Sequence, residues 1–573
     1  MQVFGDIERR EDPGAITAEI TVQLDRCRRA SPGLDCHQLL VGAFIRASEL
    51  VQGLLDADFA TVGWDEVSEP RSSAESLMLQ LAKAVVASWE SGFMDLRALP
   101  DQTGFELLSR KGAVRTKLAE GYAFYALYPE AYVTAAHQSN LGPDTTVIGI
   151  RSIGVGLGAI VAATLGASAA ESVRPVGHPF DRHLEIGPEL ASRLLARSGS
   201  FAVVDEGPGL SGSSFNCVAD WLVAHGVAER RIHFFPSHAG DLGYAAHDCH
   251  RTRWQQAQKH VASFDQAILG ATRSEHRLEN WIADGVGPLG DSLRDLSGGA
   301  WRGPSSSDLQ PADPAMEKRK FLAITGSGSW LAKFVGIGSQ GENSFTLAST
   351  LADAGFSPPA AGLCHGFLVT PWVHPNSSRG FPPIQRVLDY LAFRSRLPPT
   401  TPGASLEQLF AMAVHNFHEH WGDPAADAVR KALGDPGRFT AVPCCTDNRM
   451  HAWEWVRATD GWQKLDSLDH HAAHDMVGCQ DIAWDVAGAA VEFGLSNRQR
   501  EALRTALSTR IGREVPHRFV AANELCYLGF QIGLWTMSLA RNGEAEQRST
   551  KALIARYEER ARHALLRARL DMG

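Results

Sequence analysis

The chain has 573 residues, of which 44% are apolar and 21% are charged, an ordinary balance for a globular protein with a large core. Its net charge of −10 and isoelectric point near 6.1 argue against nucleic acid or an anionic membrane as the main partner. No stretch approaches 18 uncharged apolar residues, the start lacks the apolar core of a signal peptide, and the nine cysteines form no CxxC pair. We therefore expect a cytoplasmic protein with reduced thiols that acts on small molecules and has no membrane partner.

Residues 1–115 are predicted to be mainly helical. Apolar residues recur at helical spacing in "HQLLVGAFIRASELVQGLLDADFA" and in "SSAESLMLQLAKAVVASW", which follows a serine-rich helix start. Over residues 116–288, short β-branched runs alternate with helical stretches: "TTVIGI" precedes "GLGAIVAATLGA", and "SFAVVD" precedes "SFNCVADWLVAHG". Strands that alternate with helices predict βαβ units and a mainly parallel sheet.

Residues 289–316 are rich in Gly, Pro, Ser and Asp, a composition typical of a linker. A second unit begins at residue 317 with β-like segments and ends in helices. The basic tail "STKALIARYEERARHALLRARL" reads as a helix with one packed face, and a helix that binds a partner is the alternative.

The segment "FAVVDEGPGLSGSSFNC" (201–217) places two acids and a Gly/Ser loop between a strand and a helix. In parallel sheets, ligands bind at the carboxyl ends of strands, where we expect Asp205 and Glu206 to lie. Because carboxylates accept hydrogen bonds from ribose hydroxyls and a loop entering a helix binds phosphate, the segment predicts a ribose 5-phosphate site. An ordinary turn with capping serines is the alternative. The residues of the predicted phosphate loop are Ser211, Gly212, Ser213 and Ser214.

This pattern resembles the fingerprint of the type I phosphoribosyltransferases, although the spacer "GPGL" is one residue longer than usual. The resemblance implies an α/β phosphoribosyltransferase-type parallel sheet over 116–288, with residues 1–115 as a helical N-terminal extension. It also implies phosphoribosyl transfer from phosphoribosyl pyrophosphate to an unknown acceptor, with Mg²⁺, and places Asp205 and Glu206 at the reacting ribose.

In that family an upstream loop binds the pyrophosphate, and the corresponding segment here is "VIGIRSIGVGLGAI" (147–160). An arginine at a strand end suits a diphosphate, while a surface arginine beside a helix cap is the alternative. The residues expected at this turn are Arg151, Ser152 and Gly154. Residues 172–187 match the position of the family's mobile flap and carry Arg174, His178, Arg182 and His183.

Two further segments, "EGYAFYALYPEAY" (120–132) and "DLSGGAWR" (295–302), are similar to segments of phosphoribosyltransferase-like proteins from bacterial stress and tellurite-resistance operons. Core packing is the simpler role for the aromatic residues. The resemblance covers about residues 115–303 and does not identify the acceptor.

Residues 317–375 resemble the small lobe of a kinase. The segment "WLAKFVGIG" places Lys333 in a strand, and "GENSFTLASTLADAGF" begins a helix with Glu342. In kinases a strand lysine orients the ATP phosphates and pairs with a helix glutamate, so the resemblance assigns both residues to ATP binding.

Residues 376–573 resemble the large lobe of the aminoglycoside phosphotransferases, followed by C-terminal helices. The resemblance implies Asp447 of "CCTDNRMHAWEWV" as the catalytic base and Asp466 of "QKLDSLDHHAAHD" as the metal ligand. Two features depart from the family: its second metal-binding residue, an Asn, is Ala452 here, and "GSGSW" falls short of a full glycine-rich loop. His470 and His474 have a spacing that could ligate a metal, but a polar loop is the simpler interpretation.

These observations together predict a bifunctional enzyme that combines an α/β parallel-sheet domain with an α+β two-lobed kinase-like domain. The expected reactions are phosphoribosyl transfer and ATP-dependent phosphotransfer to a small molecule. Two alternatives stay open: an active phosphoribosyltransferase with an inactive, nucleotide-sensing kinase-like domain, and a non-catalytic, nucleotide-responsive scaffold. A homodimer also stays open, and we do not expect nucleic acid as a partner.

Overall fold

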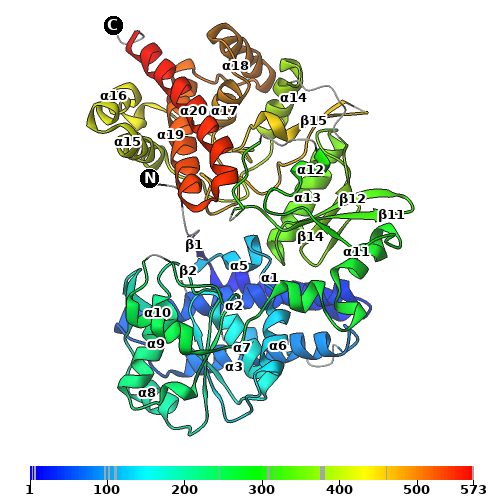
Figure 1. The fold of residues 1–573 in the computed structure, drawn as a ribbon, viewed down its shortest axis with the longest axis vertical. Helices are drawn as coiled ribbons and strands as arrows, with labels where there is room; N and C mark the ends of the chain where they lie inside the picture. Colours follow the sequence, from blue (N-terminus) through cyan, green and yellow to red (C-terminus); the bar gives the residue numbers. More distant parts are fainter. Residues whose placement is uncertain are drawn as a thin grey trace.

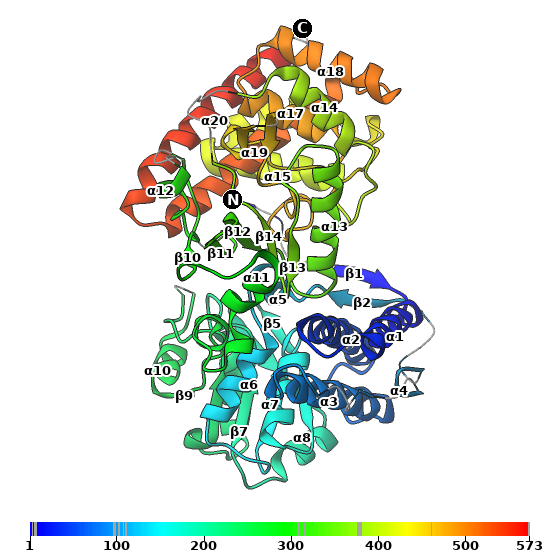
Figure 2. The same ribbon diagram turned by 90° about the vertical axis from the view of Figure 1, so that its right-hand side faces the viewer.

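The computed structural model describes residues 1–2, 4, 8–95, 99–100, 103–106, 108, 112–243, 245–305, 310–314, 316–374, 381–459 and 461–570. The sequence-predicted site residues all lie within these ranges. Figure 1 shows an N-terminal half at the bottom, a small antiparallel sheet above it, and a helical lobe at the top. Figure 2 gives the same arrangement from the side.

Three helices form the N-terminal extension: α1 (Pro13–Arg29), α2 (Leu34–Val62) and α3 (Glu69–Glu90). The side chains of Asp12 and Ser68 accept hydrogen bonds from backbone N–H groups and so cap α1 and α3. By length and composition α2 could cross a membrane, but 89% of its most apolar window is buried within the protein, as expected of a core helix. Short elements complete this region: β1 (Glu8–Glu11), α4 (Thr103–Glu106) and β2 (Val114–Lys117), with β1 and β2 antiparallel.

A five-stranded sheet with the order β4-β3-β7-β8-β9 forms the core of the N-terminal half, and all its neighbouring strands are parallel. The prediction of a mainly parallel sheet is therefore confirmed. The four longer strands are buried along their whole length because helices cover both faces. The strands are β3 (Thr146–Ile150), β4 (Ala170–Val173), β7 (Phe201–Val204), β8 (Ile232–Phe235) and β9 (Gln258–Lys259).

The two faces of this sheet belong to different hydrophobic clusters. Alternate residues of β7 point to opposite sides: Ala202 and Val204 pack with α2, α3 and the helices after residue 119, whereas Phe201 and Val203 pack with α8 and α9. An antiparallel hairpin of β5 (Pro175–His178) and β6 (Asp181–Leu184) lies beside α9. The helices of this half are α5 (Glu120–Phe124), α6 (Pro129–Gln138), α7 (Gly154–Leu165), α8 (Pro188–Leu195), α9 (Ser213–Ala224), η1 (Glu229–Arg231), α10 (Asp248–Gln256), η2 (Asp265–Leu269), η3 (Ser274–His276) and α11 (Leu278–Val286).

A second, antiparallel sheet has the order β10-β11-β12-β14-β13. Its strands are β10 (Arg294–Asp295), β11 (Lys320–Thr325), β12 (Gly328–Phe334), β13 (Gly362–Cys364) and β14 (Phe367–Pro371), and α13 (Ser339–Asp353) packs on it. In "GSGSW", Gly326 and Ser327 form only the two-residue loop between β11 and β12. Strand β10 and α12 (Arg302–Ser305) lie in the segment that the sequence suggested as a linker.

The C-terminal lobe is mainly helical and packs its helices around two clusters of buried side chains. One of these clusters includes Leu368 of β14 and Val335, which directly follows β12, so the two lobes share a core. The elements are α14 (Ile384–Arg394), α15 (Leu406–Trp421), α16 (Asp423–Leu433), η4 (Pro436–Arg438), η5 (Ala452–Glu454), β15 (Trp455–Ala458), β16 (Gly461–Lys464), α17 (Ala483–Glu492), α18 (Asn497–Ile511), α19 (His517–Arg541) and α20 (Glu544–Leu570).

The N-terminal half and the small sheet are also joined by a continuous core. Phe334 and Phe367 of the small sheet belong to the same hydrophobic cluster as α2, α3 and α6. At the contact of α2 with the loop before α13, a Cβ on Gly42 would lie 3.3 Å from the Cα of Gly338, so glycine permits this close approach.

Candidate functional site

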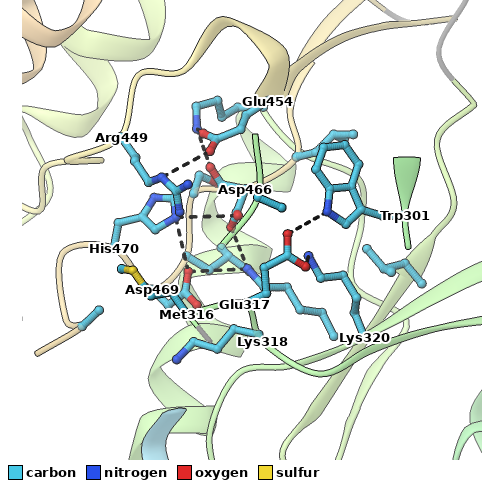
Figure 3. A pocket seen from close by; sticks show the side chains of 18 of the residues that line it. Trp301, Met316, Glu317, Lys318, Lys320, Arg449, Glu454, Asp466, Asp469 and His470 are labelled. Atoms are coloured by element: carbon cyan, nitrogen blue, oxygen red, sulfur yellow. Dashed lines mark hydrogen bonds and ion pairs between the residues drawn. The ribbon is translucent and has the colours of Figure 1, made fainter. Parts of the chain in front are cut away.

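A cavity of about 280 Å³ lies among the small sheet, the large lobe and segment 124–125 (Figure 3). Strands β11 and β12 contribute lysines, and η5 and the loop after β16 contribute acids. The charged lining residues central to the site are Lys318, Lys320, Lys333, Arg449, Glu454, Lys464, Asp466, Asp469 and His470. The larger aromatic lining residues are Phe124, Tyr125, Trp301, Trp372, Trp453 and Trp535.

Lys333 on β12 meets two aspartates of the loop that follows β16. Its Nζ lies 2.6 Å from Oδ1 of Asp466 and 3.5 Å from Oδ1 of Asp469. Burial alone would lower the pKa of Lys333, but the two carboxylates outweigh it and hold the pKa above its ordinary value. Burial favours the neutral acid in Asp466, yet Lys333 and His470 hold its pKa well below the usual range. The cavity therefore contains a charged lysine–aspartate pair that bridges the two lobes.

Asp447 does not line this cavity, although the sequence suggested it as the catalytic base. It is 1% exposed, and its carboxylate accepts a hydrogen bond of 2.5 Å from the Tyr390 hydroxyl. The Nζ of Lys464 and the Nδ1 of His470 each lie 3.4 Å from it. Burial would raise the pKa of Asp447, but Lys464 and His470 hold it below its ordinary value. Asp447 thus lies behind these two cations, as seen from the cavity.

His470 connects Asp447 to Asp466. Its Nε2 lies 3.6 Å from Oδ2 of Asp466, on the opposite side of the ring from Asp447. Burial would lower the pKa of His470, but the neighbouring carboxylates raise it to about 9. At neutral pH this imidazole is therefore a cation within the acidic cluster.

The loop that carries Asp447 is held by Asp485 of α17. The backbone N–H groups of Asp447 and Asn448 donate to the two carboxylate oxygens of Asp485, at 2.7 and 2.9 Å. Asn448 has a φ of +68° and donates its side-chain amide to the carbonyl of Gly478 at 2.7 Å. These hydrogen bonds fix the conformation of the loop that carries Asp447.

Ala452, where the resemblance to the aminoglycoside phosphotransferases led us to expect an Asn, has no ligand atom in its side chain. Two residues later, Glu454 lines the cavity and bonds Nζ of Lys464 at 2.5 Å. One ligand atom each from Glu454, Asp466 and His470 lie within 4.8 Å of one another. This carboxylate-rich cluster is the part of the cavity that could hold a metal ion.

Glu342 is not brought to Lys333. It lies in the first turn of α13, where its side chain is 42% exposed and 3.7 Å from Arg26 of α1. His474 lies apart from the acidic cluster: its Nε2 is 3.0 Å from the hydroxyl of Tyr125.

A second site contains Asp205 and Glu206 at the carboxyl end of β7, where the sequence placed them. Oδ1 of Asp205 accepts the N–H of Glu206 at 2.9 Å, and the Tyr132 hydroxyl donates to the Asp205 carbonyl at 2.8 Å. Burial raises the pKa of Asp205 to about 6, against the opposing charges of Arg182 and Arg174. Burial, together with the charges of Asp205 and Glu120, raises the pKa of Glu206 to about 8. This pair therefore favours a cationic or hydrogen-donating ligand.

The predicted phosphate loop lies against the hairpin that carries Arg182. Ser213 donates from Oγ to the carbonyl of Pro179 at 2.8 Å, and Ser211 donates to Oγ of Ser213 at 2.9 Å. Gly212 has a φ of +61° and precedes α9, whose first two residues are Ser213 and Ser214. The structure therefore brings the serine loop and the hairpin together.

Arg151 occupies a different environment from the one expected. Its guanidinium is fully buried and pairs with Asp65 and with Asp56, the latter at 3.2 Å. Arg174 pairs with Asp56 and donates to the carbonyl of Arg151 at 2.8 Å. Ser152 is half-buried beside this pair. These two acids could not be predicted as partners of Arg151, because they belong to the helical extension far upstream in the sequence.

Gly154 begins α7 and must be small. A Cβ at this position would lie 2.7 Å from the carbonyl oxygen of Val204 at the end of β7. The close approach keeps the loop at 151–154 beside the strand end that carries Asp205.

Several residues of the cavity were not predicted from the sequence. Asp469 could have been found as a second acid three residues after Asp466, and Lys318 belongs to the basic run "KRK" that leads into β11. Arg449 and Glu454 flank the Asp447 loop, but nothing in their spacing distinguishes them from surface charges. Trp301 comes from the segment read as a linker.

No protein-family model and no curated protein matches this chain. Among solved structures, the choline kinase LicA from Streptococcus pneumoniae is 15% identical over 43% of this chain and 89% of its own, with a TM-score of 0.31. The macrolide 2′-phosphotransferase MphH from Brachybacterium faecium is 13% identical over 48% of this chain and 96% of its own, with a TM-score of 0.32. A thermostable mutant of the aminoglycoside phosphotransferase APH(4)-Ia is 13% identical over 50% of this chain and 99% of its own, also with a TM-score of 0.32.

Proposed function

We propose that the C-terminal half is an ATP-dependent small-molecule phosphotransferase and that the cavity is its active site. The observation that carries this proposal is the 2.6 Å pair between Lys333 and Asp466 across the cavity. Phosphotransferases use a strand lysine to hold the ATP phosphates and an aspartate of the opposite lobe to hold Mg²⁺. Lys333 on β12 and Asp466 on the loop after β16 support this assignment.

The donor set fits Mg²⁺. Asp466 and Asp469 offer carboxylate oxygens, the ligands that Mg²⁺ prefers, and Glu454 offers a third carboxylate near the position of Ala452. When bound, Mg²⁺ would neutralise charge on the phosphate oxygens. Lys333 would orient the phosphates, and the aromatic walls would exclude water.

In this proposal Asp447 is the catalytic base, and it also has a second role in the resting site. While Lys464 and His470 cover it, Asp447 positions these two cations at the floor of the cavity. For Asp447 to accept the proton of a substrate hydroxyl, these side chains must move aside when substrate binds.

Titration calorimetry with ATP, with and without Mg²⁺, tests the proposal on the wild type, Lys333→Met and Asp466→Asn. We expect at least about tenfold weaker ATP binding for Lys333→Met and loss of the Mg²⁺ effect for Asp466→Asn. The exposed Lys431 on α16 supplies the control Lys431→Met. Equal affinities in all four proteins contradict the proposal, and ATP binding without ADP formation for any acceptor favours the nucleotide-sensing alternative.

We also propose a second function, phosphoribosyl transfer from phosphoribosyl pyrophosphate, for the N-terminal half. What favours it is the Asp205–Glu206 pair at the end of a central parallel strand, facing the charges of Arg174 and Arg182. Carboxylates at this place can accept the ribose hydroxyls, and the serine loop can accept the 5-phosphate. Both substrates are cytoplasmic metabolites, so we propose that location for the protein.

Arg151 contributes to pyrophosphate binding only if the ligand draws it from Asp56 and Asp65. The test is titration of phosphoribosyl pyrophosphate with Mg²⁺ against the wild type and Asp205→Asn/Glu206→Gln. Saturable binding that the double variant loses supports this function. Binding that survives unchanged in the double variant, or no binding by the folded wild type, contradicts it.

A further inference from the structure

Segment 120–125 forms part of both candidate sites. On one side, a Cβ on Gly121 would lie 2.9 Å from Oε1 of Glu206, so the backbone of α5 touches that carboxylate. On the other side, Phe124 and Tyr125 line the cavity. Oε2 of Glu120 lies 3.8 Å from Nε2 of His474, which also lines it. One short helix therefore separates the Asp205–Glu206 site from the cavity.

A half-buried lysine, Lys318, lies on the cavity side of this helix. Nζ of Lys318 donates to the carbonyl of Phe124 at 3.3 Å and lies 4.2 Å from the centre of the Phe124 ring. Within the described part of the chain, no carboxylate lies within ion-pair distance of Lys318, whereas Lys320 has Glu317 at 3.2 Å. Burial lowers the pKa of Lys318 to about 8, and Asp469 and Asp475 only partly oppose this effect.

A desolvated cation without a direct counter-charge favours an anionic ligand. A cationic substrate at this wall would be repelled by Lys318, with no carboxylate among the described residues of the wall beside Lys318 to offset the repulsion. The other cations of the cavity already have carboxylate partners, as Lys333 has Asp466. Lys318 is thus the position in the cavity where an incoming anion gains most.

We propose that the phosphoryl acceptor in the cavity is a phosphate-bearing ribosyl compound, the product of the Asp205–Glu206 site, and that Lys318 binds its phosphate. This inference rests on both proposed functions. In the transfer, a hydroxyl oxygen of the ribosyl compound forms a bond to the γ-phosphorus of ATP. The bond from that phosphorus to the β–γ bridging oxygen breaks, ADP leaves, and the hydroxyl proton passes to a neighbouring carboxylate or to water.

The test uses ribose 5-phosphate and ribose as probes, in the Asp205→Asn/Glu206→Gln background to remove binding at the first site. The protein is saturated with Mg²⁺ and a non-hydrolysable ATP analogue, so that the ATP phosphate site is filled. We expect ribose 5-phosphate to bind and ribose not to bind. Adding Lys318→Met should weaken the binding of ribose 5-phosphate by at least about tenfold. Adding Lys318→Arg should preserve most of the affinity, and adding the control Lys431→Met should preserve all of it.

The inference is overturned if the Asp205→Asn/Glu206→Gln variant does not bind ribose 5-phosphate. It is also overturned if adding Lys318→Met leaves the affinity for ribose 5-phosphate unchanged. Displacement of ribose 5-phosphate by the ATP analogue overturns it as well. Lys318→Gln provides a second neutral variant if Lys318→Met melts below the parent. If the phosphotransferase proposal is wrong, the ATP analogue will not bind, and this result is distinguishable from the outcomes above. In that case ribose 5-phosphate is titrated without the analogue against the same variants.

Discussion

His365 in the turn between β13 and β14 and Glu130 of α6 share a fully buried hydrogen bond of 2.8 Å, although 235 residues separate them. Nε2 of His37 lies 2.8 Å from the same carboxylate oxygen. Burial would raise the pKa of Glu130, but the two imidazoles hold it well below its ordinary value. The two halves of the chain are thus joined by a buried polar link as well as by a common hydrophobic core.

Replacing Glu130 should therefore destabilise both halves together. Glu130→Ala removes the buried carboxylate that two imidazoles share, and we expect a loss of about 3 kcal/mol in the free energy of unfolding. Urea unfolding followed by circular dichroism and tryptophan fluorescence measures this loss. An exposed pair of the same type, Glu90 with His137 at 2.6 Å, supplies the control Glu90→Ala, which should change little. Equal effects of the two variants would show that the buried link is not important for stability.

The acids of the N-terminal site should make the ligand-free protein less stable as pH rises. The pKa of Glu206 is about 8 when folded but ordinary when unfolded, so between these values the folded state holds a proton that the unfolded state has lost. Stability therefore falls as pH rises from about 4.5 to 8. Asp205→Asn/Glu206→Gln should gain stability relative to the wild type as pH rises from 4.5 to 8, because the variant has no carboxyl group here to lose a proton. Thermal melts across this range that run parallel for both proteins would contradict the assignment.

Asp485 should be essential to the shape of the Asp447 loop. Asp485→Ala removes the acceptor of two buried N–H groups, and we expect a loss of about 2–4 kcal/mol together with loss of phosphotransfer. Asp485→Asn keeps one acceptor oxygen and should lose about half as much. Chemical denaturation of the two variants gives the comparison. A loss equal in both would indicate that the charge, rather than the paired bonds, holds the loop.

Local pattern in the sequence predicted the parts of the fold that depend on neighbours along the chain. The alternation of strands and helices in 146–235 is present as a parallel sheet, and Lys333 lies on a strand with Asp466 on a loop opposite it. These elements follow from hydrophobic periodicity, which a single sequence displays.

Contacts between segments that are distant in sequence could not be predicted in this way. Arg151 meets Asp56 and Asp65, and Glu342 meets Arg26, because α1 and α2 pack against regions distant in sequence. Lys318 gains its place in the cavity only because β11 adjoins segment 124–125. Such pairings depend on how preformed surfaces dock, and no spacing along the chain encodes them.

The most direct test of the phosphotransferase proposal is a crystal structure of the protein with Mg²⁺ and a non-hydrolysable ATP analogue. We expect the phosphates to lie in the cavity, with Lys333 contacting their oxygens and Mg²⁺ on the carboxylate of Asp466. Nucleotide bound elsewhere, or phosphates in the cavity without contact to Lys333 and Asp466, would contradict it.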